Sequence, residues 1–174
     1  MKFSILTFGC KVNQYDSQEM REALGASLQE ASRGETADIV VVNTCTVTAE
    51  ADRQARQAMR RIRRKNPSAR IIASGCYARR AAEVLVKDGL ADAVARGTGP
   101  GPLLDALGLA APDSTERKGI GGFAGHTRAF VKVQDGCDRR CSFCIVPLVR
   151  GKSESRPAEI IIDEVRRLAA GGVP

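Results

Sequence analysis

The first hundred residues alternate between short apolar runs and segments with helical periodicity. Three apolar runs, at residues 3–8, 39–42 and 71–74, predict buried strands. The run at 39–42 is β-branched throughout, which is typical of a strand covered on both faces. A weaker strand is predicted at residues 93–95.

A segment with helical character follows each of these strands. Asp16 or Ser17 opens the first helix, and Asp16 and Glu19 have the spacing of a capping box. Further helices are predicted over residues 49–65, 79–87 and 103–107. Alternating strands and helices imply a parallel sheet with right-handed crossovers, so we expect an α/β domain of the flavodoxin or Rossmann type.

Each of the first three predicted strands ends at a cysteine: Cys10, Cys45 and Cys76. Ligands of parallel sheets bind beyond the carboxyl ends of the strands, so these three thiols are predicted to meet at one sheet edge. The alternative is three unrelated core cysteines, since free cysteine is often buried. The same placement after three successive strands favours a shared site.

A change of composition divides the chain. Residues 112–125 are polar and glycine-rich, which predicts a linker. We therefore expect domains at residues 1–110 and 128–174, joined by a linker at 111–127. A strand at 129–133, a turn at 147–151 and a helix at 157–170 are predicted in the second part. His126 is the only histidine, and its place at the end of the linker indicates a surface turn rather than a metal ligand.

The composition indicates a folded, basic protein. The chain has 174 residues, of which 43% are hydrophobic and 27% charged, so a core can form. Its formal net charge of +7 makes a polyanion a candidate partner. Most of this excess lies in residues 52–65, whose predicted helix carries Arg53, Arg56 and Arg60. These three arginines are candidate RNA contacts, and the alternative is an ordinary solvated helix face.

The N-terminal apolar run does not predict export. It spans about six residues, whereas a signal peptide needs roughly 7–15. The chain also has no apolar stretch near the ~20 residues of a membrane helix. We therefore expect a cytoplasmic protein with no membrane contact, whose six cysteines are metal ligands rather than disulfides.

The second group of cysteines is closely spaced. Cys137, Cys141 and Cys144 form a C-x3-C-x2-C pattern, with Phe143 just before the last cysteine. Three close thiolates can bind three irons of a 4Fe-4S cluster and leave the fourth iron open. Structural zinc needs four ligands, so a zinc site would need a distant fourth residue. A redox-sensing thiol protein is a further alternative.

These motifs together resemble the radical S-adenosylmethionine (SAM) methylthiotransferases. The matching stretches are residues 8–17 (FGCKVNQYDS), 42–48 (VNTCTVT), 74–77 (SGCY) and 128–151. The sequence KVNQY at residues 11–15 most resembles that of the branch that modifies N6-threonylcarbamoyladenosine at position 37 of tRNA. Sister branches modify isopentenyladenosine in tRNA or a ribosomal protein.

The resemblance implies two 4Fe-4S clusters. Cys137, Cys141 and Cys144 would hold the cluster that binds and cleaves SAM, and Phe143 would lie against this cofactor. The three strand-end cysteines would hold an auxiliary cluster carrying the sulfur to be transferred. The product would be adenosine methylthiolated at C2. The partner would be the tRNA anticodon loop, and the protein would be a monomer. The resemblance leaves the sulfur and electron donors open.

The resemblance also implies a partial barrel of about six βα units, which needs on the order of 180 residues. From Ala129 onward the chain has 46 residues. We therefore expect only the first βα unit of a truncated radical SAM barrel, in a chain that is inactive on its own. The competing interpretation is a non-catalytic iron–sulfur or RNA-binding module.

Overall fold

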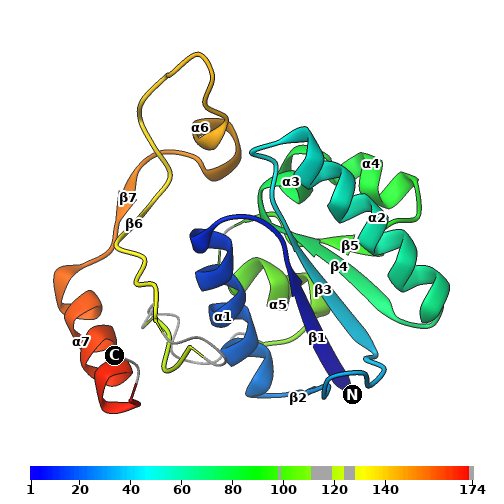
Figure 1. The fold of residues 1–174 in the computed structure, drawn as a ribbon, viewed down its shortest axis with the longest axis horizontal. Coiled ribbons are helices and arrows are strands. Elements are labelled where there is room, and N and C mark those ends of the chain that lie inside the picture. The colour runs from blue at the N-terminus through cyan, green and yellow to red at the C-terminus, as the bar shows by residue number, and fades with distance from the viewer. Residues whose placement is uncertain (98, 111–118, 124–127, 173–174) are drawn as a thin grey trace.

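The computed structural model describes residues 1–97, 99–110, 119–123 and 128–172. Its centre is a five-stranded parallel sheet in the order β2-β1-β3-β4-β5 (Figure 1). The strands are β1 (Lys2–Thr7), β2 (Gln29–Glu30), β3 (Ile39–Thr44), β4 (Arg70–Ser74) and β5 (Ala93–Val94). This is the strand order of flavodoxin-like sheets, so the predicted α/β class is confirmed.

Helices cover both faces of this sheet. They are α1 (Lys11–Gly25), α2 (Ala49–Lys65), α3 (Gly75–Arg80), α4 (Ala82–Lys87) and α5 (Gly101–Leu107). One apolar cluster joins α1 and α5 to the sheet and includes Met20, Leu24 and Leu103. A second cluster joins α2, α3 and α4 to the other face and includes Met59 and Leu85. The sheet is therefore buried on both sides, as its β-branched central strand predicts.

The three central strands end level with one another. Thr7 of β1 is in register with Asn43 of β3, and Asn43 is in register with Ser74 of β4. The residues that follow these strand ends therefore share one edge of the sheet. The chain crosses from one face to the other between β1 and β3, the place where parallel sheets bind ligands.

Two predicted helix boundaries are wrong. The first helix begins at Lys11, directly after Cys10, and the predicted capping box does not form. Asp16 and Glu19 are instead buried and bind Lys132, 116 and 113 residues further along the chain. The spacing of Asp16 and Glu19 therefore lets both carboxylates bind Lys132, and it does not cap the helix.

The other wrong boundary is that of the helix predicted at 79–87. The structure contains two short helices here, separated at Ala81, and the first of them begins at Gly75. Thr44 explains this early start. Its hydroxyl accepts a hydrogen bond from the Ala78 amide at 2.9 Å, which satisfies one of the free amides of the first helical turn.

The second part of the chain wraps around α1. It consists of β6 (Gln134–Asp135), α6 (Val146–Arg150), β7 (Glu154–Ser155) and α7 (Ala158–Ala170). The two short strands pair with each other in antiparallel fashion. A third apolar cluster joins this part to α1, and its buried members are Tyr15, Ile120, Phe123 and Leu168. The helix predicted at 157–170 corresponds to α7, whereas the segment predicted as a turn at 147–151 forms the short helix α6, which ends before Gly151.

The strand predicted at residues 129–133 is wrong. A strand needs a neighbour to pair its backbone groups, and among the described residues the ladder of this part begins only at Gln134. The apolar residues of the segment pack onto the third cluster instead. Of the predicted linker, residues 119–123 are described and bury Ile120 and Phe123. His126 lies outside the described residues.

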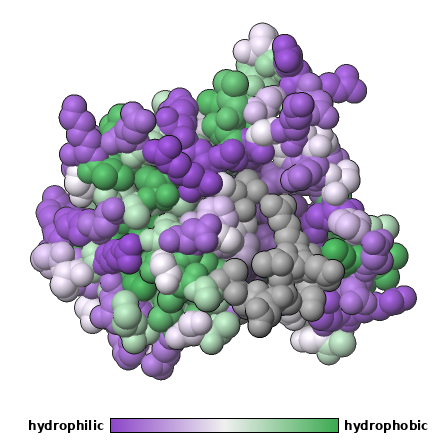
Figure 2. Space-filling model, turned by 180° about the vertical axis from the view of Figure 1, so that it is seen from behind, coloured by the Kyte–Doolittle hydropathy of each residue, from purple (hydrophilic) through white to green (hydrophobic). Residues whose placement is uncertain are grey.

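The surface seen from behind is mostly hydrophilic. On this face hydrophobic residues form separate areas between hydrophilic ones (Figure 2). Among the described residues no helix combines the length and the apolar character that crossing a bilayer requires.

Candidate functional site

The three strand-end cysteines lie at the carboxyl edge of the sheet. Cys10 is the residue before α1, Cys45 follows β3, and Cys76 is the second residue of α3. The thiol-bearing residues Cys45 and Cys76 are buried, whereas Cys10 is exposed. Cys45 and Cys76 are thus shielded from water, and Cys10 is accessible at the surface.

Two glycines let these chain segments approach one another closely. A Cβ atom on Gly9 would collide with the Cβ of Cys45 and lie 2.7 Å from its Sγ. A Cβ on Gly75 would collide with the carbonyl oxygen of Thr44, the residue before Cys45. Both glycines also have positive φ, which residues with a side chain rarely adopt. The glycines before Cys10 and Cys76 therefore pack both segments against the end of β3.

This packing predicts a large effect of Gly9→Ala. The added methyl group would displace Cys45 and strain the backbone at φ +104°, so we expect a loss of about 1–3 kcal/mol in the free energy of unfolding. Urea unfolding measures this loss. Gly25→Ala, at a position with open space, is the matched control and should leave stability unchanged or higher. Equal stability of the two variants would contradict the close approach.

The environment of Cys76 acts on its ionisation in two directions. Burial raises the pKa of its thiol, while the positive charge of Arg150 and a hydrogen bond from it lower the pKa. Negative charge on the neighbouring Cys45 and Cys10 would raise the pKa of Cys76 further. Iron binds thiolate rather than thiol, so the guanidinium favours the form that a metal needs.

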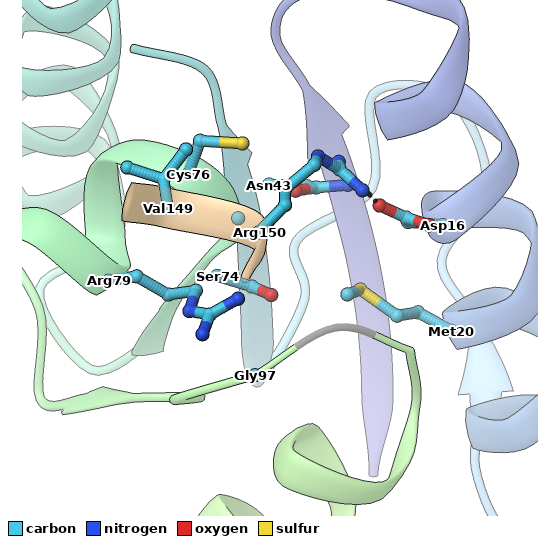
Figure 3. A pocket seen from close by; sticks show the side chains of 10 residues that line it. Asp16, Met20, Asn43, Ser74, Cys76, Arg79, Gly97, Val149 and Arg150 are labelled. Carbon is cyan, nitrogen blue, oxygen red and sulfur yellow. Dashed lines mark hydrogen bonds and ion pairs between the residues drawn. The ribbon is translucent and has the colours of Figure 1, made fainter. Parts of the chain in front are cut away.

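A small cavity of about 10 Å³ adjoins Cys76 and is lined by Asn43, Ser74, Arg79 and Arg150 (Figure 3). This is room for about one water molecule. The Asn43 Oδ1 and Ser74 Oγ atoms are buried and have no hydrogen-bond partner among the described residues. The cavity therefore has polar atoms that could bind a small ligand next to the Cys76 thiol.

The second group of cysteines lies on the loop between β6 and α6. The Cys137 amide donates to the Gly151 carbonyl at 3.1 Å, which closes the loop at its base. The Cys144 amide donates to the Cys141 carbonyl at 3.1 Å, which folds the last two cysteines into a turn. Phe143 is 91% exposed, so its ring is free to meet a ligand.

The donor chemistry of both groups fits iron–sulfur clusters. Among the described residues, no three or more His, Cys, Asp or Glu side chains are arranged around a single metal ion. A 4Fe-4S cluster instead uses one thiolate for each iron, so its ligands stand wider apart than those of one ion. Each group supplies three thiols, one set from three neighbouring strand ends and one set from a single short loop, which is the number of thiolates that such a cluster with one open iron needs.

The predicted arginines on α2 differ in their contacts. Arg53 forms an ion pair with Glu50 at 2.6 Å, and Arg56 donates a hydrogen bond to the Tyr77 hydroxyl at 2.7 Å. Arg60 is exposed, and within the part of the chain that the structure describes it makes no ion pair or hydrogen bond. Arg80 pairs with Asp52 and also lies over the Tyr77 ring. Basic side chains of α2 and α3 thus gather beside Cys76.

Sequence reasoning missed three polar residues that build this region. Asn13, Lys132 and Arg150 are buried or nearly buried and make hydrogen bonds between the two parts of the chain. A signal was present in α1. Its apolar stripe at Met20 and Leu24 continues toward the N-terminus as Asn13 and Asp16, and polar residues on a buried face need polar partners.

One protein family and several curated proteins are similar to this chain. The family described as "Uncharacterized protein family UPF0004" matches residues 2–96. This match contains all three strand-end cysteines. It ends before the loop that carries the second group.

Curated relatives match nearly the whole chain. Threonylcarbamoyladenosine tRNA methylthiotransferase MtaB of Chlamydia pneumoniae is 38% identical over 165 residues, which are 94% of this chain and 39% of the relative. The protein of the same name from Aquifex aeolicus is 35% identical over 99% of this chain and 46% of its own length. A tRNA-2-methylthio-N(6)-dimethylallyladenosine synthase of Sorangium cellulosum is 34% identical over 98% of this chain and 39% of its own length. The chain spans about two fifths of the length of such relatives.

Proposed function

This chain belongs to the UPF0004 family, and from that premise we propose that it forms part of a tRNA methylthiotransferase that uses SAM and two 4Fe-4S clusters. The proposed substrate is N6-threonylcarbamoyladenosine at position 37 of the anticodon loop. Relatives named for threonylcarbamoyladenosine are 33–38% identical to this chain and relatives named for dimethylallyladenosine 33–34%, so the choice of substrate rests mainly on the sequence KVNQY at residues 11–15.

One observation carries the proposal. Three thiols at the ends of β1, β3 and β4 share the carboxyl edge of the sheet, and the loop with Cys137, Cys141 and Cys144 joins the same edge through α6. Two separate three-thiol groups at one edge suit a reaction that needs two clusters with open irons. A zinc site or a single redox disulfide would use only part of this arrangement.

The residues have distinct roles under this proposal. Cys137, Cys141 and Cys144 would hold the cluster that binds SAM, and Phe143 would offer its exposed ring to that cofactor. Cys10, Cys45 and Cys76 would hold the auxiliary cluster, and of these three residues Cys10 is the exposed one. Bound SAM and its cluster supply the one-electron chemistry that an aromatic C–H bond needs. Arg150 holds positive charge beside Cys76, which favours its thiolate.

Basic residues beside the edge would bind tRNA phosphates. Arg53 and Arg56 lie in the first two turns of α2, near the end of β3, and Arg60 lies one turn further along the helix. Arg79 of α3 is exposed and lines the cavity next to Cys76. Phosphate contacts of this kind give affinity and orientation, while the base is selected at the reaction centre.

The test is product formation by the anaerobically reconstituted chain with SAM, a strong reductant and tRNA. We expect cluster loading and binding to tRNA, and the informative readouts are 5′-deoxyadenosine and methylthiolated nucleoside. 5′-Deoxyadenosine would show that the chain cleaves SAM, and methylthiolated nucleoside would establish methylthiotransfer; either product would exclude the non-catalytic module. Cluster and tRNA binding without either product is expected both of that module and of a chain that is inactive on its own. Absence of iron would contradict the proposal.

A further inference from the structure

The two cysteine groups come from distant parts of the chain, yet one guanidinium contacts the framework of both. Arg150 lies on α6, six residues after Cys144. Its side chain is 7% exposed and reaches α1, Asp135 and the neighbourhood of Cys76. Figure 3 shows the Arg150 side chain passing Asn43 and reaching Asp16, and Cys76 lines the same pocket.

The Asn13 side chain links the chain segments that carry Cys10 and Cys45. Its Nδ2 atom donates to the carbonyl of Phe8 at 2.8 Å and to the carbonyl of Thr44 at 2.9 Å. Phe8 lies two residues before Cys10, and Thr44 lies directly before Cys45. The backbone carbonyl of Asn13 also accepts a hydrogen bond from Asn43 Nδ2 at 2.9 Å. One buried amide therefore fixes the ends of β1 and β3 relative to each other.

Arg150 links this amide to the second cysteine group. Its Nη2 atom donates to Asn13 Oδ1 at 2.7 Å and to Asp16 Oδ2 at 2.8 Å. Its Nη1 atom donates to the two carboxylate oxygens of Asp135 at 2.9 and 3.0 Å. Asp135 lies two residues before Cys137. The planar guanidinium thus contacts the first site with one nitrogen and the base of the second cysteine loop with the other.

Arginine suits this task better than lysine. Its donors form a rigid fork with fixed directions, whereas the lysine ammonium is a compact charge on a flexible stem. Buried charge pairs add little to stability when compared with apolar packing, but their directional hydrogen bonds fix an arrangement. The position of Arg150 is therefore better explained by geometry than by stability alone.

We propose that Asn13 and Arg150 are positioning residues that hold the base of the second cysteine loop in one fixed placement relative to the three strand-end cysteines. Asn13 sets the spacing within the first group, and Arg150 sets the second group against it. This arrangement is a property of the chain's own hydrogen bonds. It does not rest on the proposed reaction or on what the thiols bind.

Hydrogen–deuterium exchange of the full chain tests the proposal. Arg150→Lys is expected to accelerate exchange in residues 136–150 and 8–14 by roughly tenfold, because hydrogen bonds to a buried charged group are lost. Exchange in β3 and β4 should stay as in the wild type. Arg156→Lys is the matched control, since Arg156 is also a buried arginine but binds Tyr15 and Glu164. It should loosen α7 and leave the cysteine loop protected.

Asp135→Asn is a milder variant that serves if Arg150→Lys does not fold. It weakens the contact between Arg150 and the second loop, together with the longer ion pair of Asp135 with Lys132 at 3.8 Å. We expect faster exchange in residues 136–150 alone. Asn13→Ser combined with Arg150→Lys should loosen that loop no further than Arg150→Lys does, because both act on one contact. Unchanged exchange in the loop, or equal acceleration throughout the chain, would overturn the positioning role.

Discussion

Anaerobically reconstituted protein is expected to hold about eight irons with matching sulfide, and the variant Cys10→Ala/Cys45→Ala/Cys76→Ala about four. The reason is the separation of the two thiol groups. Cys10, Cys45 and Cys76 come from three strand ends, while the other three cysteines form one loop. Colorimetric iron and sulfide analysis, together with the electron paramagnetic resonance spectrum of the reduced protein, measures the loss of one cluster.

The reciprocal variant Cys137→Ala/Cys141→Ala/Cys144→Ala is the matched control. It should also retain about four irons, held by the strand-end group, with a different spectrum. Combining all six substitutions should remove the iron. If the first triple variant kept the full iron content, the strand-end thiols would be core cysteines rather than ligands. Zinc in place of iron would contradict the cluster assignment for both groups.

Lys132→Met is expected to destabilise the protein by about 3–5 kcal/mol, because it leaves the buried Glu19 carboxylate without its ion-pair partner and removes one of the two cations that bind Asp16. Lys132 Nζ lies 2.6 Å from Asp16 Oδ1 and 3.1 Å from Glu19 Oε2, and all three side chains are at most 8% exposed. Urea unfolding of chains with equal iron content measures the effect. Lys65→Met, at an exposed position of α2, is the control and should change stability by less than about 0.5 kcal/mol.

The loss caused by Lys132→Met should depend on pH. Burial raises the pKa of Glu19, and Lys132 opposes that rise. Without Lys132 the folded-state pKa rises further above the unfolded value, so the folded state gains stability as the pH falls through it. The difference between variant and wild type is therefore largest near neutral pH and shrinks toward about pH 4. A difference independent of pH would indicate a loss of packing rather than of charge pairing.

The sequence was sufficient to predict the sheet and the meeting of Cys10, Cys45 and Cys76. Both follow from local periodicity and from the geometry of parallel strands. Contacts between distant segments could not be predicted in this way. The spacing of Asp16 and Glu19 suits a helix cap and a buried ion pair equally, and only the position of Lys132 decides between them. Likewise, residues 129–133 have strand composition but no paired neighbour in the described structure.

The wrapping of the second part around α1 has a consequence for synthesis of the chain. Tyr15 donates a hydrogen bond to Glu164, 149 residues later, and Asp16 pairs with Lys132, 116 residues later. Domains generally fold from the N-terminus as the chain leaves the ribosome. The sheet can therefore form while the outer face of α1, with its carboxylates, is still hydrated. The loop that carries Cys137 must then dock on an edge that already exists, so the order of translation is also the order of assembly of the two thiol groups.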